Sequence, residues 1–332
     1  YFVVLKRSFL CDKINSRLEF KIMTQPHAIF LMGPTASGKT DLAIRLAQNY
    51  PIDIISVDSS MVYRGLDIGT AKPSAAELAL APHRLIDIRD PAQAYSAAEF
   101  REDALKEMAE ISSRGRIPVS VGGTMLYFKV LKDGLADLPQ ANEHIRNKII
   151  LQAQAEGWAA IHQQLALVDS ITAARLKPTD SQRLQRALEV YLVTGTPLSV
   201  WHEQQQKQSL PYHLHQFALL PQDRSILHER IEKRFDLMLQ QGLIDEVTVL
   251  KNRIDLNLDL PSMRSVGYRQ VWEYLNNDYD YDEMRFKGIV ATRQLAKRQY
   301  TWLRSFGTDV HQLDTQDAWI VLQDCLKNFK IA

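Results

Sequence analysis

Residues 28–40 read AIFLMGPTASGKT, and the last eight of them match the phosphate-loop pattern G-x-x-x-x-G-K-[ST]. The apolar run at residues 28–32 predicts a strand buried on both faces, and residues 40–49 predict a helix after the loop. In that setting the loop's backbone N–H groups and the helix N-terminus surround an oxyanion. The residues expected to bind phosphate are Gly33, Pro34, Thr35, Ala36, Ser37, Gly38, Lys39 and Thr40, with Thr40 as the Mg²⁺ ligand.

Strands and helices alternate around this loop. Ser96 and Glu99 predict a capping box at the start of a helix that runs to about residue 114. Further buried strands are predicted at residues 53–57, 85–88 and 117–121. This alternation is typical of an α/β fold with a parallel sheet covered by helices on both faces.

Three chemically informative residues each follow a predicted strand, namely Gly33, Asp58 and Gly122. Ligands of parallel sheets bind at the carboxyl ends of the strands, so we expect these residues to line one crevice. Asp58 closes the run IISVD, the form of the strand that NTPases use to hold Mg²⁺ through water. Its place after the first helix is equally that of a substrate-binding Asp in small-molecule kinases. The strand at residues 117–121 ends in Gly-Gly without an acid, which is unusual for an NTP hydrolase.

The second half of the chain is mostly helical by its pattern. Residues 140–208 are rich in Ala, Gln, Leu and Arg and contain no convincing strand. A strand is predicted at residues 215–220, and a strand–helix pair at residues 310–313 and 317–329. Long helices are predicted at residues 224–241, 243–252, 265–276 and 282–306.

These elements predict an α/β parallel sheet core with an inserted all-helical domain. The expected divisions are a disordered extension at residues 1–22, the first part of the core at 23–137, the helical insertion at 138–212, and the continued core with basic C-terminal helices at 213–332.

Composition excludes several classes of protein. The 332 residues are 45% hydrophobic, with 40 Lys and Arg against 39 Asp and Glu, which is typical of a globular chain and not of a uniformly basic nucleic-acid coat. No apolar run approaches the ~18–20 residues that span a bilayer, so no integral membrane protein is expected. The only cysteines, Cys11 and Cys325, form neither a disulfide framework nor a zinc site, which favours a reducing compartment, the cytoplasm.

Beyond the phosphate loop, a series of blocks extends from about residue 28 to about residue 304: VDSSMVYRGLDIGTAKP, HRLIDIRDP, YSAAEF, GGTMLY, QRLQRALEVY, ERIEKRF, SVGYRQ and ATRQLAKRQYTWLR. With GPTASGKT, these blocks resemble the tRNA dimethylallyltransferase family, also called tRNA isopentenyltransferases, of the bacterial type. The resemblance implies a P-loop kinase-like parallel sheet core with a helical insertion. It also implies dimethylallyl diphosphate as donor and N6 of adenosine 37, next to the tRNA anticodon, as acceptor. The implied products are the prenylated tRNA and diphosphate.

The candidate catalytic residues fit that reaction. The leaving diphosphate gains charge as its C–O bond breaks, and Lys39, Mg²⁺ and, by the resemblance, Arg234 would stabilise it. Asp58 is the candidate general base for the N6 proton. Thr35 is expected to hydrogen-bond the diphosphate or the base.

An RNA-binding surface is predicted along the last long helix. Six basic residues and no acidic one lie between residues 285 and 304, and Arg293, Lys297 and Arg304 share one helix face. Together with the family motifs this predicts contacts to the anticodon stem-loop. The expected tRNA-binding residues are Asp58, Ser59, Ser60, Met61, Thr124, Arg146, Gln182, Arg183, Leu184, Gln185, Arg186, Arg264, Ser265, Val266, Gly267, Tyr268, Arg269, Lys297, Arg298, Gln299, Tyr300, Thr301, Trp302, Leu303 and Arg304.

Two other functions compete with an RNA prenyltransferase. A P-loop kinase of a small metabolite or nucleoside would use Asp58 for a substrate hydroxyl and the inserted domain as a lid. A non-enzymatic RNA-binding P-loop protein would turn over neither ATP nor a prenyl donor. The expected cofactor is Mg²⁺, the expected partners are tRNA and dimethylallyl diphosphate, and we expect a monomer without membrane association.

Overall fold

The computed structural model describes residues 25–205, 209–221, 223–314 and 317–328. The predicted extension at residues 1–22, with Cys11, lies outside the described residues. Among the residues described, no helix combines the length and apolar character that crossing a bilayer requires.

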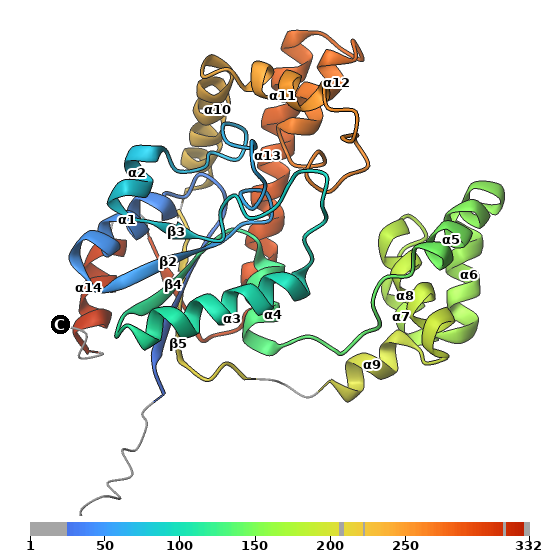
Figure 1. Cartoon of the computed structure of the whole chain (residues 1–332), viewed down its shortest axis with the longest axis horizontal. Coiled ribbons are helices and arrows are strands. Elements are labelled where there is room, and N and C mark those ends of the chain that lie inside the picture. Colours follow the sequence, from blue (N-terminus) through green and yellow to red (C-terminus); the bar gives the residue numbers. More distant parts are fainter. Residues whose placement is uncertain (1–24, 206–208, 222, 315–316, 329–332) are drawn as a thin grey trace, which may run out of the picture.

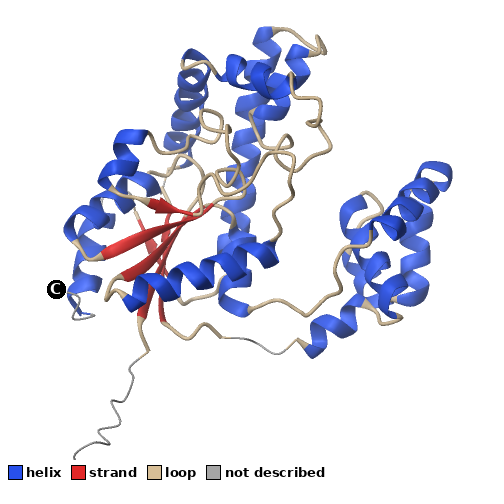
Figure 2. Ribbon diagram, in the orientation of Figure 1, coloured by secondary structure: helices blue, strands red, loops and turns tan. Residues whose placement is uncertain are grey.

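The core is a six-stranded sheet in which every pairing is parallel (Figures 1 and 2). Its spatial order is β3-β2-β4-β1-β5-β6. The strands are β1 (His27–Met32), β2 (Ile52–Val57), β3 (His83–Arg84), β4 (Ile117–Gly122), β5 (His213–Leu219) and β6 (Val310–Leu313). The predicted α/β class with a parallel sheet is therefore confirmed.

The register of the three central strands brings their carboxyl ends level. Gly122 is paired with Met32 on one side and with Val57 on the other. The segments that follow β1, β2 and β4 consequently leave the sheet side by side. A Cβ at Gly122 would lie 2.0 Å from the Val57 carbonyl oxygen, so only glycine fits at this edge.

Helices cover both faces of the sheet. One face is buried under α1 (Lys39–Asn49) and α14 (Ala318–Asn328), and the other under α3 (Ala97–Ser113) and α4 (Met125–Asp133). The predicted capping box is present, since the Ser96 side chain accepts from Glu99 N and Glu99 accepts from Ser96 N. Two helices were not predicted: α2 (Ala75–Leu80), which begins with a capping box of its own at Ser74, and α4.

Four helices gather over the carboxyl edge of the sheet: α10 (Arg224–Gln240), α11 (Leu243–Lys251), α12 (Tyr268–Leu275) and α13 (Tyr281–Arg304). Their apolar side chains join the core beneath α3 and α4. The contact between α10 and α13 is close, because a Cβ at Gly288 would lie 2.1 Å from the ring of Phe235. Phe235 is the neighbour of Arg234, so this contact also sets the position of Arg234.

The helices of residues 143–204 form a separate group beside the core (Figure 1). They are α5 (Glu143–Glu156), α6 (Trp158–Val168), α7 (Ser170–Arg175), α8 (Ser181–Thr194) and α9 (Leu198–Gln204). Their buried side chains, such as Ile161, Leu165 and Leu188, make a hydrophobic cluster of their own. We propose the limits 138 and 212 for this inserted unit.

Two predicted boundaries were wrong. The third strand is His83–Arg84 and not residues 85–88, because Leu85 and Asp87 have left-handed backbones, with φ of 62° and 57°, which end the strand. Helix α12 begins at Tyr268 and not at residue 265, because Gly267, with φ of 94°, interrupts the helical backbone.

The contact between α10 and α13 can be tested by Gly288→Ala. We expect a loss of ~1–3 kcal/mol in unfolding free energy, the usual cost of overpacking, although alanine is the better helix former. Chemical denaturation measures it, with Gln294→Ala at an exposed position of the same helix as control, expected within ~0.5 kcal/mol of the parent. Equal stability of the two variants would contradict the close contact with Phe235.

Candidate active site

The phosphate loop, residues 33–40, joins β1 to α1 with a backbone that small residues permit. Ala36 and Gly38 adopt left-handed conformations, with φ of 63° and 90°. A Cβ at Gly33 would lie 2.6 Å from the Leu219 carbonyl oxygen on the neighbouring strand. Gly38 caps α1 without any side-chain hydrogen bond, so the first N–H groups of the helix remain available to an anion.

Lys39 lies inside this loop. Its Nζ donates to the carbonyl oxygen of Pro34 at 2.6 Å and contacts Ser37 Oγ at 3.4 Å. Removal from water, and then the charge of Arg234, lower the pKa of Lys39 to about 7, while the charge of Asp58 opposes that shift. The free site thus disfavours its own positive charge, which an incoming oxyanion would stabilise.

Arg234 lies on α10, and its charge acts on Lys39. Its Nη2 donates to the Thr70 carbonyl oxygen at 3.5 Å. Burial lowers the pKa of Arg234, and the carboxylates of Asp58 and Asp41 act against that shift. The structure therefore brings together three of the predicted catalytic residues: Lys39, Asp58 and Arg234.

Asp58 follows β2 and is held by its own turn. Its Oδ1 accepts from the backbone N–H groups of Ser60 at 2.8 Å and Met61 at 3.2 Å. Within the described residues Oδ2 makes no hydrogen bond, so it remains available to a ligand. The same turn touches two distant segments, because Ser59 N donates to Thr124 Oγ1 at 3.1 Å and Ser60 Oγ lies 2.9 Å from Ser265 Oγ.

The loop that presents Thr70 to Arg234 is fixed by a residue that the sequence did not indicate. Glu246 on α11 accepts from the N–H groups of three consecutive loop residues, Asp67, Ile68 and Gly69, at 2.8–3.2 Å. It also accepts from the hydroxyl of Tyr268. Its separation along the chain hides this contact from any local sequence pattern.

Thr40 is placed in the first turn of α1, and its hydroxyl makes no hydrogen bond within the described chain. No cluster of three or more His, Cys, Asp or Glu suited to a metal occurs among the described residues. A single hydroxyl beside a phosphate site fits Mg²⁺, which keeps several waters and takes further oxygens from substrate phosphates. The residues present thus fit a cation that arrives with a phosphate ligand.

The basic run on α13 has acidic partners, contrary to the prediction. Arg285 pairs with Asp236 at 2.6 Å and Arg293 with Glu232 at 3.0 Å, both acids lying on α10. Lys287 pairs with Glu283 at 2.9 Å, one turn earlier on α13. These three cations are engaged within the fold. The remaining three are exposed and form no ion pair in the described part of the chain: Lys297, Arg298 and Arg304.

The residues predicted to bind tRNA divide by burial. Leu184 and Tyr268 are fully buried, Leu303 is nearly so, and Gln299 is only 8% exposed, so these side chains face the protein interior. Exposed members are Ser59, Gln182, Arg183, Arg264, Lys297, Arg298, Thr301 and Arg304. Partly exposed members are Asp58, Ser60, Met61, Thr124, Gln185, Ser265, Val266, Arg269, Tyr300 and Trp302, while Gly267 is buried.

In the inserted unit, two of the arginines predicted to bind tRNA form ion pairs with a buried carboxylate. Glu189 has a fully buried side chain and pairs with Arg146 at 3.0 Å and Arg186 at 2.8 Å. Arg183, in contrast, is exposed on the same helix as Arg186. Arg183 is thus the better placed of these arginines for a phosphate.

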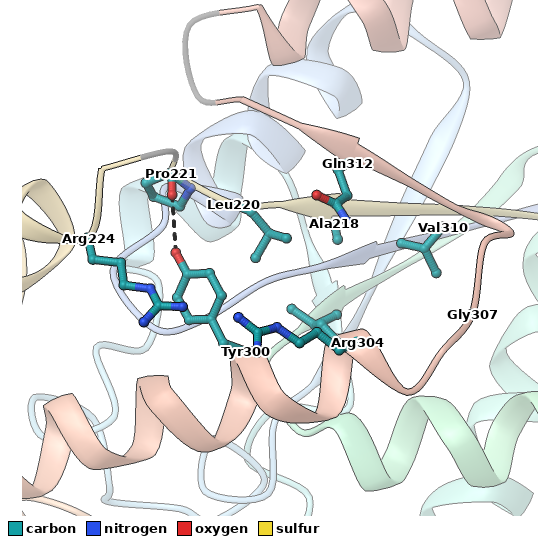
Figure 3. A pocket seen from close by; sticks show the side chains of 10 residues that line it. Ala218, Leu220, Pro221, Arg224, Tyr300, Arg304, Gly307, Val310 and Gln312 are labelled. Atoms are coloured by element: carbon teal, nitrogen blue, oxygen red, sulfur yellow. Dashed lines mark hydrogen bonds between the residues drawn. The ribbon is translucent and has the colours of Figure 1, made fainter.

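A cavity of about 400 Å³ lies between β5, β6 and the end of α13 (Figure 3). Arg224 and Arg304 line it, and the Tyr300 hydroxyl donates to the Pro221 carbonyl oxygen at 3.3 Å. The guanidinium of Arg224 lies 5.5 Å from the centre of the Tyr300 ring. Since β1 separates β4 from β5, the cavity beside β5 and Asp58 after β2 lie on opposite sides of β1 in the strand order.

Comparison with known proteins points to one family. The model of the IPP transferase family matches residues 61–306. The chain is similar to the solved tRNA isopentenylpyrophosphate transferase of Bacillus halodurans, with 34% identity over 91% of this chain and 96% of that one, at a TM-score of 0.66. It is similar to the tRNA delta(2)-isopentenylpyrophosphate transferase of Staphylococcus epidermidis, with 33% identity over 92% and 99%, at a TM-score of 0.66. A eukaryotic dimethylallyltransferase acting on tRNA matches with 25% identity over 91% and 80%, at a TM-score of 0.78.

The lowered pKa of Lys39 makes a prediction for anion binding. Diphosphate should favour the charged amine and take up a proton, so its affinity should fall as pH rises above 7, by up to about tenfold per pH unit. Calorimetric titration with inorganic diphosphate between about pH 6.5 and 9 measures this. The matched variant Lys39→Met corrects for titration of the ligand itself, and parallel pH curves for the two proteins would contradict proton uptake by Lys39.

Proposed function

The chain belongs to the IPP transferase family, and we infer from this membership that it is a tRNA dimethylallyltransferase. The reaction transfers the dimethylallyl group of dimethylallyl diphosphate to N6 of adenosine 37, next to the anticodon, and releases diphosphate. The observation that carries this inference is the meeting of Lys39, Arg234 and Asp58 at the carboxyl edge of the sheet. Two cations for an oxyanion and one carboxylate for a proton are the groups that such a transfer needs.

Lys39 and Arg234 would bind the diphosphate and stabilise the charge that develops on it as the allylic C–O bond breaks. The backbone N–H groups of the phosphate loop and the first turn of α1 would hold the other phosphate oxygens. Thr35 belongs to the same loop, and we propose that its hydroxyl bonds the diphosphate or the base.

We propose that Thr40, with substrate oxygens and water, holds Mg²⁺ when the donor is bound. The ion would supply further charge neutralisation to the leaving diphosphate.

Asp58 would take the proton from N6 as the new bond forms. Its Oδ1 is occupied by two backbone N–H groups, which orients the carboxylate and leaves Oδ2 for the substrate. The adenine has to leave its stack to reach this position, which is least costly in a single-stranded loop of RNA. The turn from Asp58 to Met61, with Thr124 and Ser265 beside it, would surround the extruded nucleotide.

The anticodon stem-loop would be gripped by exposed cations at the periphery. Lys297, Arg298 and Arg304 on α13 and Arg183 on the inserted unit are free to contact phosphates. We propose that the protein acts in the cytoplasm, where its tRNA substrate is found, and that it works as a monomer.

A small-molecule kinase is the competing function, and family membership does not support it. The structure also gives β4 no acid at its carboxyl end, where Gly122 and Gly123 are packed closely against Val57 and Gln299. Any acidic side chain at these positions would collide with its neighbours.

The function is tested by mass spectrometry of tRNA nucleosides after incubation with dimethylallyl diphosphate and Mg²⁺. Prenylated adenosine should form without ATP, and Asp58→Asn should lower turnover by ~10²–10⁴-fold with little change in tRNA affinity. Asp309→Asn, at an exposed loop position, is the control and should behave like the parent. Unmodified tRNA, or ADP released from ATP with a metabolite, would refute the assignment.

The proposed RNA grip predicts a salt dependence. Lys297→Ala and Arg298→Ala should each lower the slope of log tRNA affinity against log salt by ~0.7–0.9, because one phosphate contact is lost. The donor Michaelis constant should stay unchanged. Lys287→Ala, on the same helix but paired with Glu283, should leave the slope as it is. The slopes are obtained from tRNA affinities measured at three salt concentrations. Identical slopes for all variants and the parent would exclude these contacts.

A further inference from the structure

Gln299 is a buried amide among basic neighbours. Lys297 and Arg298 on the same turn of α13 are exposed, whereas Gln299 is 8% exposed and points into the protein. Burial of an amide is costly unless its hydrogen bonds are satisfied. The hydrogen-bond partners of the Gln299 amide therefore indicate the reason for its burial.

Both ends of the Gln299 side chain are used by loops of the active site. Oε1 accepts from the backbone N–H of Thr35 at 2.8 Å, and Nε2 donates to the carbonyl oxygen of Gly123 at 2.9 Å. The opposite orientation of the amide would bring two donors together at Thr35 and two acceptors together at Gly123. The amide therefore has one orientation that joins the phosphate loop to the segment after β4.

The segment after β4 continues to the proposed base. Thr124 follows Gly123, and its Oγ1 accepts from Ser59 N, next to Asp58, at 3.1 Å. Thr124 N also donates to the Val57 carbonyl oxygen at 3.2 Å. A continuous set of contacts thus leads from Thr35 through Gln299 and Gly123 to the turn that carries Asp58.

The space for this amide depends on a glycine. A Cβ at Gly123 would lie 2.3 Å from Gln299 Nε2. Any larger residue at position 123 would push the amide away from its two partners.

We propose that Gln299 is a positioning residue that fixes the separation between the donor diphosphate and the base Asp58. This inference rests on the proposed function. The two reacting groups are held by different loops, after β1 and after β2, and no hydrogen bond joins these two loops directly within the described residues. Transfer needs the allylic carbon and N6 within bonding reach, and a displacement of about 1 Å can cost about 10²-fold in rate.

The test compares Gln299→Met, which keeps the size of the side chain and loses both hydrogen bonds, with Gln294→Met at an exposed position of the same helix. Gln299→Met should lower kcat by ~10–100-fold while the tRNA dissociation constant changes less than about twofold. Gln294→Met should match the parent. Normal turnover of Gln299→Met, or weakened tRNA binding with normal kcat, would overturn the positioning role.

Gln299→Glu provides a readout that a merely structural role would not move. The ionised carboxylate can accept from Thr35 N–H but repels the Gly123 carbonyl oxygen, whereas the protonated carboxyl can donate to it. The ratio of its kcat to that of the parent should therefore rise as pH is lowered from about 8 to about 6. A ratio independent of pH would argue against the bridge.

Gly123→Ala tests the same bridge without altering Gln299, and it replaces Gln299→Met if that variant fails to fold. It should lower kcat and leave tRNA affinity unchanged, because its Cβ displaces the amide. Parent protein that leaves tRNA unmodified would overturn the proposed function and this inference with it. Parent protein that prenylates tRNA, with Gly123→Ala equally active, would overturn the inference alone.

Discussion

The site depends on two cations, Lys39 and Arg234, that are held largely out of water. Burial and the charge of Arg234 lower the pKa of Lys39, and burial lowers the pKa of Arg234. Asp58 opposes both shifts, and Asp41 also opposes that of Arg234. Each cation alone would be better solvated at the surface, so the arrangement is unfavourable until an anion enters. A diphosphate would reverse that balance by placing several negative oxygens between the two cations.

The parts of this site that are local in sequence were predictable. The phosphate loop, its flanking strand and helix, and the strands ending at Val57 and Gly122 all follow from short apolar runs bounded by small residues. Their convergence also follows, because parallel strands present their carboxyl ends at one edge. The role of Arg234 required the family resemblance, since in sequence it is one charged residue in a charged helix.

The features that the sequence did not predict depend on contacts between distant segments or on backbone conformation. The acids that neutralise Arg285 and Arg293 lie on α10, so the sequence of α13 shows an unpaired basic run that the fold does not contain. Glu246, which binds three backbone N–H groups of the loop beside Arg234, gives no local signal at all. Leu85 ends its strand because its backbone is left-handed, a conformation that a leucine in the sequence does not indicate.

Helix α13 connects these observations. Gly288 and Gln299 are eleven residues apart, about three helical turns, so they share the face turned to the core, about 16 Å from each other along the axis. At Gly288 the helix packs against Phe235, and this contact positions the neighbouring Arg234. At Gln299 the helix binds the phosphate loop, which carries Lys39. Lys297, about half a turn away from that face, and Arg298 are exposed. One rigid helix therefore fixes both cations of the donor site while presenting other cations outward, so the position of bound RNA is set relative to the same helix as the diphosphate.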